Sequence, residues 1–299
     1  MERLRGWIFA ITLGVILPGI LLRVIPSQQE EMPQEAPAAK LHMVQVLMED
    51  GSVSTVELEI YVMGVVAAEM PESFDIEAMK AQAVLARTYA LKRMQAGDKH
   101  PEGFLCAKSS CCQAYKPDAV TDIVKTAVEE TTGMVLTYED QLIEATYYSC
   151  SGGQTEDAAA VWGQDVPYLR SVESPGEEQS AHYVTTTKLS AKEFYDMLGA
   201  DPVQGFVSDL TYTDGGGIDT VTIGGKNFTG VQLRQLLGLK STAIRMSVVG
   251  DQVIITTKGY GHRVGMSQYG ADAMAVAGRD FTEILSHYYP GTVLDTYGS

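Results

Sequence analysis

The stretch YVMGVVAAEMPESFDIEAMKAQAVLARTYAL, residues 61–91, decides the fold, because it predicts two successive helices. The first helix must end before Pro71, since the residue that precedes a proline disfavours helical geometry. Asp75 can cap the second helix, and Gly97 ends it. The second helix has one narrow face of small residues, against which another element must pack closely: Met79, Ala83, Ala86 and Ala90.

Glu69 is the residue of this stretch that could carry chemistry, because it follows a run of small apolar residues. A charged side chain is rarely buried without a partner. If the run surrounds Glu69, desolvation disfavours the carboxylate and raises the pKa, which suits a general acid near neutral pH. A glutamate on the exposed side of an amphipathic helix gives the same pattern, so both interpretations stay open at this point.

The flanking patterns predict an α+β fold, with helices and antiparallel strands mixed in one core. Residues 42–60 alternate in polarity around an Asp-Gly turn and predict a hairpin. Residues 121–132 predict a helix, and residues 134–150 predict two strands. The tail, residues 267–291, is mostly helical in pattern.

Residues 182–256 have a pattern of their own and predict an inserted, smaller α/β subdomain. Helices are expected at residues 190–198 and 229–239. Strands are expected near residues 206–223 and again up to residue 256.

The N-terminal segment, residues 1–23, predicts a transmembrane helix that anchors the protein. Two arginines precede an apolar run over residues 6–22, which is at the short limit for a membrane span. Positive charge before the run places the N-terminus inside and the body outside. A cleaved signal peptide and a buried core helix are the alternatives. Residues 24–41 predict a flexible linker, which leaves residues 42–299 as the functional body.

The chain is acidic, with a net charge of −16. Binding phosphate groups requires Lys and Arg, so this charge argues against nucleic acid as a partner. It argues equally against docking on anionic lipid. A neutral polymer or a protein partner fits the composition better.

The segment HPEGFLCAKSSCCQAY, residues 100–115, concentrates three of the four cysteines. His100, Cys106 and Cys112 are evenly spaced, and zinc takes Cys sulfur and His nitrogen as ligands. A Cys106–Cys112 disulfide outside the cytoplasm is the main alternative, and free thiols are the third. Cys111 is an extra thiol beside the motif, which leaves the ligand set open.

Two Gly-rich segments have the composition of binding loops: YYSCSGGQTE, residues 147–156, and GYGHRVGMSQYGA, residues 259–271. Glycine lets backbone donors approach a ligand, and polar groups at a helix start suit sugar hydroxyls and acetamides. Plain turns would have the same appearance. The candidate residues of a binding groove are Tyr148, Ser149, Ser151, His262, Ser267 and Gln268.

Six segments, in this order, resemble the stage II sporulation protein D family: YVMGVVAAEMP, AQAVLARTYAL, HPEGFLCAKSSCCQAY, YYSCSGGQTE, VWGQDVPYLRSV and GYGHRVGMSQYGA. Together they extend over most of residues 55–292. Six segments in a fixed order are far more specific than any one of them. The predicted anchor also fits this family.

The resemblance implies a membrane-anchored lytic transglycosylase of endospore-forming bacteria. Such enzymes cut the β-1,4 bond between N-acetylmuramic acid and N-acetylglucosamine in peptidoglycan strands that have lost their stem peptides. The resemblance also implies a partner cell-wall amidase and a multi-spanning membrane protein during engulfment of the forespore. The expected location is the mother-cell membrane, with the catalytic body facing the space between the two cells. Related amidase-enhancer proteins imply the alternative, a non-catalytic glycan-binding activator of an amidase.

The resemblance places the family's catalytic glutamate at Glu69, and its zinc ligands at His100, Cys106 and Cys112. Zinc would then be structural, and the chemistry would require no cofactor. Arg87, on the second helix, is expected to pair with a carboxylate or to hold a sugar group of the substrate.

One carboxyl group is sufficient for this reaction. Glu69 protonates the leaving oxygen and then removes the proton of the sugar's own 6-hydroxyl, which closes a 1,6-anhydro ring without water. Most glycosidases need two carboxylates. Glu156 and Asp165 are the candidate second carboxylates, but both lie in loop-like segments without an apolar setting.

Overall fold

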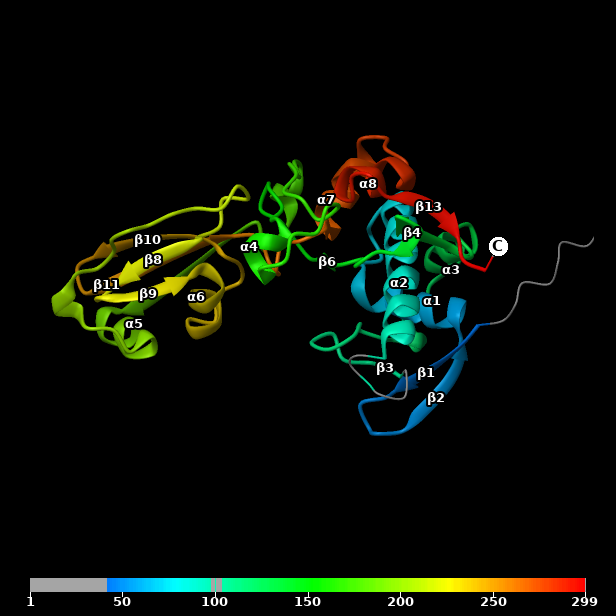
Figure 1. Ribbon diagram of the computed structural model, residues 1–299, viewed down its shortest axis with the longest axis horizontal. Coiled ribbons are helices and arrows are strands. Elements are labelled where there is room, and N and C mark those ends of the chain that lie inside the picture. The colour runs from blue at the N-terminus through cyan, green and yellow to red at the C-terminus, as the bar shows by residue number, and fades with distance from the viewer. Residues whose placement is uncertain (1–41, 98–99, 101–103, 299) are drawn as a thin grey trace, which may run out of the picture. The chain divides into compact units, whose positions relative to one another are not determined.

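The computed structural model describes residues 42–97, 100 and 104–298, which lie in one unit of the chain (Figure 1). Helices and mostly antiparallel strands are mixed along this unit, as the predicted α+β class requires. The predicted anchor, residues 1–23, and the predicted linker, residues 24–41, lie outside the described residues.

Among the described residues, no helix is both long and apolar enough to cross a membrane. The longest of them, Ile76–Ala96, carries Glu, Lys and Arg side chains along its length. This finding corrects the predicted fold class, which included a membrane-spanning helix. It also corrects the predicted single-pass location in the cell membrane, which depended on that helix.

A hairpin begins the described part of the chain, as the alternating pattern predicts. β1 (Met43–Leu47) and β2 (Val53–Glu57) pair in antiparallel orientation. β3 (Leu105–Cys106) then pairs in parallel with β1. This pairing brings the cysteine-rich segment against the hairpin.

Two helices follow the hairpin and confirm the expectation from the opening stretch. α1 (Leu58–Glu69) ends just ahead of Pro71. α2 (Ile76–Ala96) begins after Asp75, whose side chain accepts a hydrogen bond from the first turn. Gly97 ends α2 in the left-handed region, with a φ of 60°.

α2 is the central helix of the larger hydrophobic core. Its small residues let other elements pack closely against it, namely α1, α3 (Asp122–Glu129), β4 (Met134–Tyr138), α7 (Gln268–Val276) and α8 (Phe281–Tyr288). Because neighbours enclose α2, side chains from all of its faces are buried, including the guanidinium group of Arg87.

Short elements complete the larger core. β4 lies between β5 (Gln141–Leu142) and β13 (Val293–Thr296) in one antiparallel sheet. β6 (Tyr147–Tyr148) pairs in parallel with β12 (Met266–Ser267), which joins the two Gly-rich segments. The remaining short helices are α4 (Ala158–Trp162) and the 3-10 turns Pro117–Ala119, Glu177–Gln179 and Pro202–Gln204.

The segment 184–258 has a second hydrophobic core of its own. Its three-stranded antiparallel sheet has the order β10–β11–β7, and α5, α6 and the β8–β9 hairpin pack on one face. Both helices were predicted, whereas β7 was not. An inserted subdomain over residues 182–256 stays a prediction. The bounds are β7 (Val184–Ser190), α5 (Ala191–Leu198), β8 (Thr220–Ile223), β9 (Lys226–Thr229), α6 (Gly230–Leu236), β10 (Ala243–Val249) and β11 (Gln252–Lys258).

Candidate active site

Glu69, the last residue of α1, lines a cavity of about 800 Å³. Tyr147, Trp162 and His262 line the same cavity. These residues come from β6, α4 and the second Gly-rich segment. Segments that are far apart in the sequence therefore meet around the carboxyl group of Glu69.

Burial raises the pKa of Glu69 above its ordinary value, because desolvation penalises the charged carboxylate. The backbone N–H of Ala114 lies 2.9 Å from Oε1 and opposes this shift. The side chain of Gln268 also lowers the pKa, although its Nε2 has no hydrogen bond of standard geometry within the described residues. The desolvation expected from the sequence is present, and the catalytic role stays a prediction.

Gly64 allows the segment after the cysteines to close against α1. A Cβ atom at this position would lie only 2.3 Å from the ring of Tyr115, so only glycine fits here. The carbonyl oxygen of Gly64 accepts a hydrogen bond from the N–H of Lys116 at 2.9 Å. Tyr115 also stacks on Tyr61, with ring centroids 5.3 Å apart. These contacts place the N–H of Ala114 against Glu69.

His262 lines the same cavity as Glu69 and is an uncharged imidazole. Burial lowers the pKa of His262 to about 4, and the positive charge of Arg234 acts in the same direction. The N–H of Val264 donates to Nδ1 at 3.1 Å, which assigns the ring proton to Nε2. Tyr148 and Trp162 contact the ring, with centroids 5.3 and 5.4 Å away. The ring is therefore held in place as a neutral hydrogen-bonding group.

Glu144 is a second carboxyl group in this cavity that the sequence analysis missed. It forms ion pairs with Arg93 and with Lys92, the latter at 3.4 Å. Glu69 forms no such pair within the described part of the chain. Of the two carboxyl groups in this cavity, Glu144 thus has cationic partners, whereas Glu69 has none among the described residues.

Other predicted groove residues lie near the cavity without lining it. Ser267 caps α7 by accepting the N–H of Gly270 at 3.2 Å. The carbonyl oxygen of Ser149 accepts the N–H of Tyr269 at 3.0 Å. Tyr148 is buried, and its hydroxyl has no hydrogen-bond partner among the described residues. Substrate contacts by these residues stay predictions, as does one by Gln268.

Ser151 belongs to a buried network around Glu177, which the sequence analysis did not identify. The Ser151 hydroxyl donates to Glu177 at 2.7 Å, and Ser174 donates to the same carboxylate at 2.5 Å. The N–H of Gly152 and the thiol of Cys150 donate as well, at 2.9 and 3.0 Å. Because Ser151 is fully buried in this network, its side chain stabilises the Gly-rich turn and does not reach the cavity.

Arg87 is fully buried and lies away from the cavity lining. Its guanidinium group donates to both carboxylate oxygens of Glu59 and to the carbonyl oxygen of Met134, the last at 3.0 Å. Two roles were expected for Arg87, namely pairing with a carboxylate or holding a sugar. The contact with Glu59 corresponds to the first. The side chain has no exposed surface with which to hold a sugar.

The two candidate second carboxylates also lie outside the cavity lining. Glu156 is buried and pairs with Arg263 at 3.2 Å. Asp165 is mostly exposed and pairs with Arg170 at 2.7 Å.

The cysteine-rich segment brings four possible metal ligands together. The ligand atoms of His100, Cys106, Cys111 and Cys112 all lie within 4.8 Å of one another. Cys106 and Cys112 do not form the alternative disulfide. Three thiols and one imidazole are a donor set that zinc takes in four-coordinate sites. Cys111, which the expected ligand set left out, supplies the fourth donor.

Comparison with known proteins shows which family the chain belongs to. A family described as stage II sporulation protein matches residues 49–138, which include Glu69 and the cysteine-rich segment. The chain is 41% identical over 256 residues to stage II sporulation protein D of Bacillus amyloliquefaciens, covering 80% of this chain and 74% of that protein. It is 40% identical over 261 residues to stage II sporulation protein D of Bacillus subtilis (strain 168), covering 81% and 75%.

These matches define the class as that of the stage II sporulation proteins. The chain belongs to the stage II sporulation protein D family, which confirms the resemblance drawn from the six segments. A protein named amidase enhancer from Bacillus subtilis (strain 168) is 32% identical over 290 residues, covering 78% of this chain and 40% of that protein.

Proposed function

We propose that this protein is a peptidoglycan lytic transglycosylase of sporulation. Its substrate would be a glycan strand without stem peptides, cut between N-acetylmuramic acid and N-acetylglucosamine during engulfment. The observation that carries the proposal is Glu69, a desolvated carboxyl group with a raised pKa that lines a large cavity. A raised pKa favours the acid form of the carboxyl group, which is the form that glycosidic bond cleavage requires.

In the first step, Glu69 donates its proton to the glycosidic oxygen, and the bond between that oxygen and the anomeric carbon breaks. Positive charge develops on the sugar ring as the leaving strand departs with the proton. The N–H of Ala114, 2.9 Å from Oε1, stabilises the carboxylate that Glu69 has become. The neutral His262, whose Nδ1 already accepts the N–H of Val264, can act toward the sugar only as a donor through Nε2 and adds no charge.

In the second step, the 6-hydroxyl of the same muramic acid attacks its anomeric carbon. Glu69 removes the proton from that hydroxyl and returns to its acid form. The product has a 1,6-anhydro end, and no water is consumed. Glu144 forms ion pairs with Arg93 and Lys92, so we assign it no proton transfer in this reaction.

A second candidate function is a non-catalytic activator that binds glycan and stimulates a cell-wall amidase. The likeness to the amidase enhancer favours it. We propose an amidase and a multi-spanning membrane protein as working partners under either function.

The experiment that separates the two functions compares the full-length wild type with Glu69→Ala. Soluble anhydro-glycan release from denuded strands is measured by mass spectrometry, and amidase stimulation is measured on intact cell wall. The transglycosylase proposal expects release by the wild type and none by Glu69→Ala. No release by the wild type, with equal amidase stimulation by both proteins, would establish the activator instead.

We also propose that His100, Cys106, Cys111 and Cys112 bind one structural zinc ion. Four protein ligands leave no open position, so the ion would hold the segment that carries Ala114 and would take no part in the reaction. Metal analysis of the purified protein is expected to find about one zinc per chain and much less in Cys111→Ser. Full zinc content in Cys111→Ser would remove Cys111 from the ligand set.

A further inference from the structure

The outward face of the β10–β11–β7 sheet carries a group of cations. Arg245 of β10 lies opposite Thr256 of β11, and Lys258 of β11 lies opposite Ala243. Residues opposite one another in a sheet share a face, so Arg245 and Lys258 are neighbours on one side. The other side of the sheet packs into the second core through Ile244, Val253 and Ile255.

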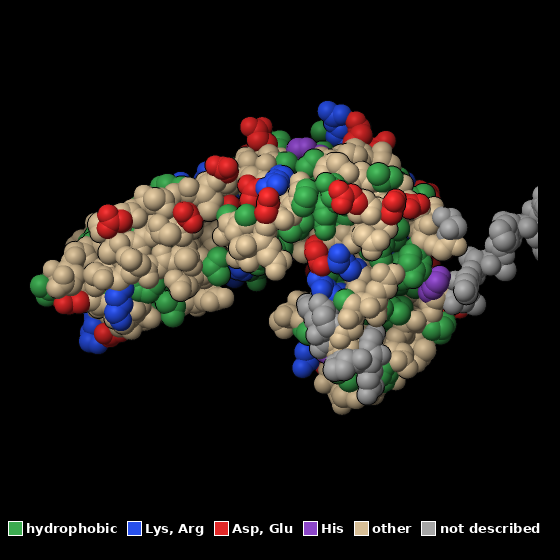
Figure 2. All heavy atoms as spheres, in the orientation of Figure 1, with side chains coloured by type: hydrophobic (Ala, Val, Ile, Leu, Met, Phe, Trp, Pro, Cys, Tyr) green, Lys and Arg blue, Asp and Glu red, His purple; other side chains and the backbone are tan. Residues whose placement is uncertain are grey.

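This face differs in charge from the rest of the chain. Lys188 of β7 extends the group, since its neighbour across the sheet, Ile254, lies on the same side as Thr256. No Asp or Glu occupies an outward position on these three described strands. Residues 182–258 contain as many Lys and Arg as Asp and Glu, so the net charge of −16 lies elsewhere. Red acidic side chains are spread over the face shown in Figure 2.

The cations of this face have no carboxylate partner. Lys188, Arg245 and Lys258 form no ion pair within the described part of the chain. The guanidinium group of Arg245 stacks over the ring of Tyr212, 4.2 Å from its centroid. Stacking holds this cation in a fixed place while its charge remains uncompensated. An uncompensated, positioned cation on an acidic protein is suited to an anionic ligand.

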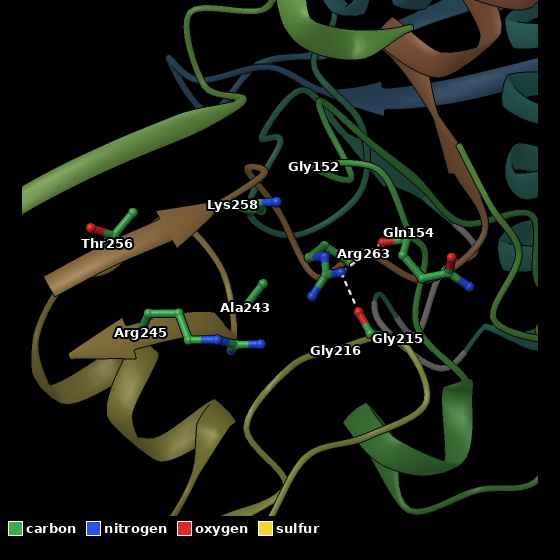
Figure 3. Close-up of a pocket in the computed structure, with 9 residues that line it drawn as sticks. All are labelled: Gly152, Gln154, Gly215, Gly216, Ala243, Arg245, Thr256, Lys258 and Arg263. Carbon is green, nitrogen blue, oxygen red and sulfur yellow. Dashed lines mark hydrogen bonds between the residues drawn. The ribbon is translucent and has the colours of Figure 1, made fainter. Parts of the chain in front are cut away.

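The face forms one wall of a cavity of about 280 Å³ (Figure 3). Arg245, Thr256 and Lys258 line this wall, and the backbone of Gly152 and Gly216 lies across from them. Figure 3 shows both cationic side chains extending from their strands toward these glycine loops. The cavity therefore offers two cations, one hydroxyl and exposed backbone to a ligand.

The close approach of the Gly152 loop gives this cavity its shape. Gly152 has a φ of 75°, and a Cβ atom there would lie 2.7 Å from the backbone of Lys258. Arg263 closes the end of the cavity, and its own charge is satisfied by Glu156 and by the carbonyl oxygens of Gln154 and Gly215. Arg245 and Lys258 are therefore the cations available to a ligand.

This cavity adjoins the one that contains Glu69. His262 lines the Glu69 cavity and Arg263, the next residue, lines the cationic one. Consecutive Cα atoms are only about 3.8 Å apart, so one short chain segment contributes to the walls of both cavities.

We propose that the cationic face of Lys188, Arg245 and Lys258 binds the carboxylate groups of the glycan strand. This inference rests on the proposed function, because it specifies what the strand presents beyond the cleaved bond. Once an amidase has removed the stem peptide, each muramic acid carries a free lactyl carboxylate, whereas glucosamine carries no charge. The guanidinium group of Arg245 matches the geometry of a carboxylate, and Thr256 suits a sugar hydroxyl.

The test measures binding in a background that cannot cleave. Full-length Glu69→Gln is titrated with denuded strands, with and without the added substitutions Arg245→Ala and Lys258→Ala. The matched control carries Lys192→Ala and Lys226→Ala, which remove two lysines from the same segment but away from this face. The ligand control is the same strand with its carboxyl groups converted to neutral methylamides.

We expect Arg245→Ala/Lys258→Ala to weaken binding of denuded strands about tenfold, because two exposed charge contacts are lost. The lysine control should change binding by less than about twofold, and added salt should reduce only the binding that depends on the cationic face. The methylamide strand should bind all three proteins equally.

Equal binding of denuded and methylamide strands, or an unchanged affinity of Arg245→Ala/Lys258→Ala, would overturn the proposal. Stronger competition by a phosphate polymer such as teichoic acid would overturn the choice of carboxylate. These results do not depend on strand cleavage, since the background is inactive. If the wild type cleaves strands but the binding test fails, only this proposal is removed. If the binding test succeeds but the wild type does not cleave, only the proposed enzyme activity is removed.

Discussion

Glu69 is half-buried and Glu156 is buried, and desolvation raises the pKa of both, yet their surroundings differ. Glu156 has the guanidinium group of Arg263 3.2 Å from its Oε1, and it also accepts from Thr213 and Gly217, both at 3.0 Å. Glu69 has no cation as a partner in the described residues and opens onto a cavity. Burial by itself therefore does not mark a catalytic carboxyl group. What distinguishes Glu69, and supports the role proposed for it, is a missing counter-charge together with access for a ligand.

The difference assigns one task to each region. The pair of Glu156 and Arg263 links the first Gly-rich segment to the segment around Gly215 and Gly217. Its contribution is to stability. Under the proposed function Glu69 carries the chemistry, and the desolvation that raises its pKa is a cost to the fold at higher pH.

The largest expected effect concerns cleavage. Glu69→Gln should lower the rate of anhydro-glycan release from denuded strands about a thousandfold, because an amide of the same shape cannot donate a proton to the leaving oxygen. Glu156→Gln should lower this rate less than about tenfold, since it touches no reacting atom. Initial rates at equal concentrations of folded protein are the measurement. Similar losses in both variants would break the comparison.

A smaller effect is expected on the free energy of unfolding. Here Glu156→Gln should be the more damaging variant and Glu69→Gln the milder one. Glu156→Gln should reduce the free energy of unfolding by about 3 kcal/mol, because it leaves the buried charge of Arg263 without its partner. Glu69→Gln should change that free energy by less than about 1 kcal/mol at neutral pH. Urea unfolding followed by fluorescence measures both. A loss in Glu69→Gln as large as that in Glu156→Gln would assign Glu69 to the framework.

The smallest effect is a dependence of stability on pH. The pKa of Glu69 is higher in the folded than in the unfolded chain, so the folded chain binds more protons between the two values. The free energy of unfolding of the wild type therefore falls as the pH rises through that window. Glu69→Gln lacks this contribution, and its stability relative to the wild type should increase over the same window and then level off. Parallel pH profiles for the two proteins would contradict the raised pKa.

The parts of the fold that were predicted correctly depend on local signals. The hairpin, the end of α1 before Pro71 and the caps of α2 at Asp75 and Gly97 are all determined by neighbouring residues. β13 was missed because all of its residues are exposed and leave no buried pattern. β7 was missed because its threonine-rich sequence becomes a strand by pairing with β11, which is distant in the chain.

The site shows the same limit. Glu69 and His262 were found because each lies in a segment of distinctive composition. Glu144 and Glu177 were missed, since each has partners more than twenty residues away in sequence, Arg93 and Ser151 respectively. Ser151 was assigned to the groove because sequence composition does not tell which way a side chain points. Cys111 could have been included among the ligands, since the tetrahedral preference of zinc asks for a fourth donor.

The most direct test of the account is a digest of denuded strands by the wild-type protein in water enriched in ¹⁸O. The reaction assigned to Glu69 closes the ring with the sugar's own hydroxyl, so every new end should be a 1,6-anhydro end without ¹⁸O. Reducing ends that carry ¹⁸O would show that water attacks the anomeric carbon. That result would contradict the single-carboxyl mechanism and direct attention to Glu144, the other carboxyl group of the same cavity.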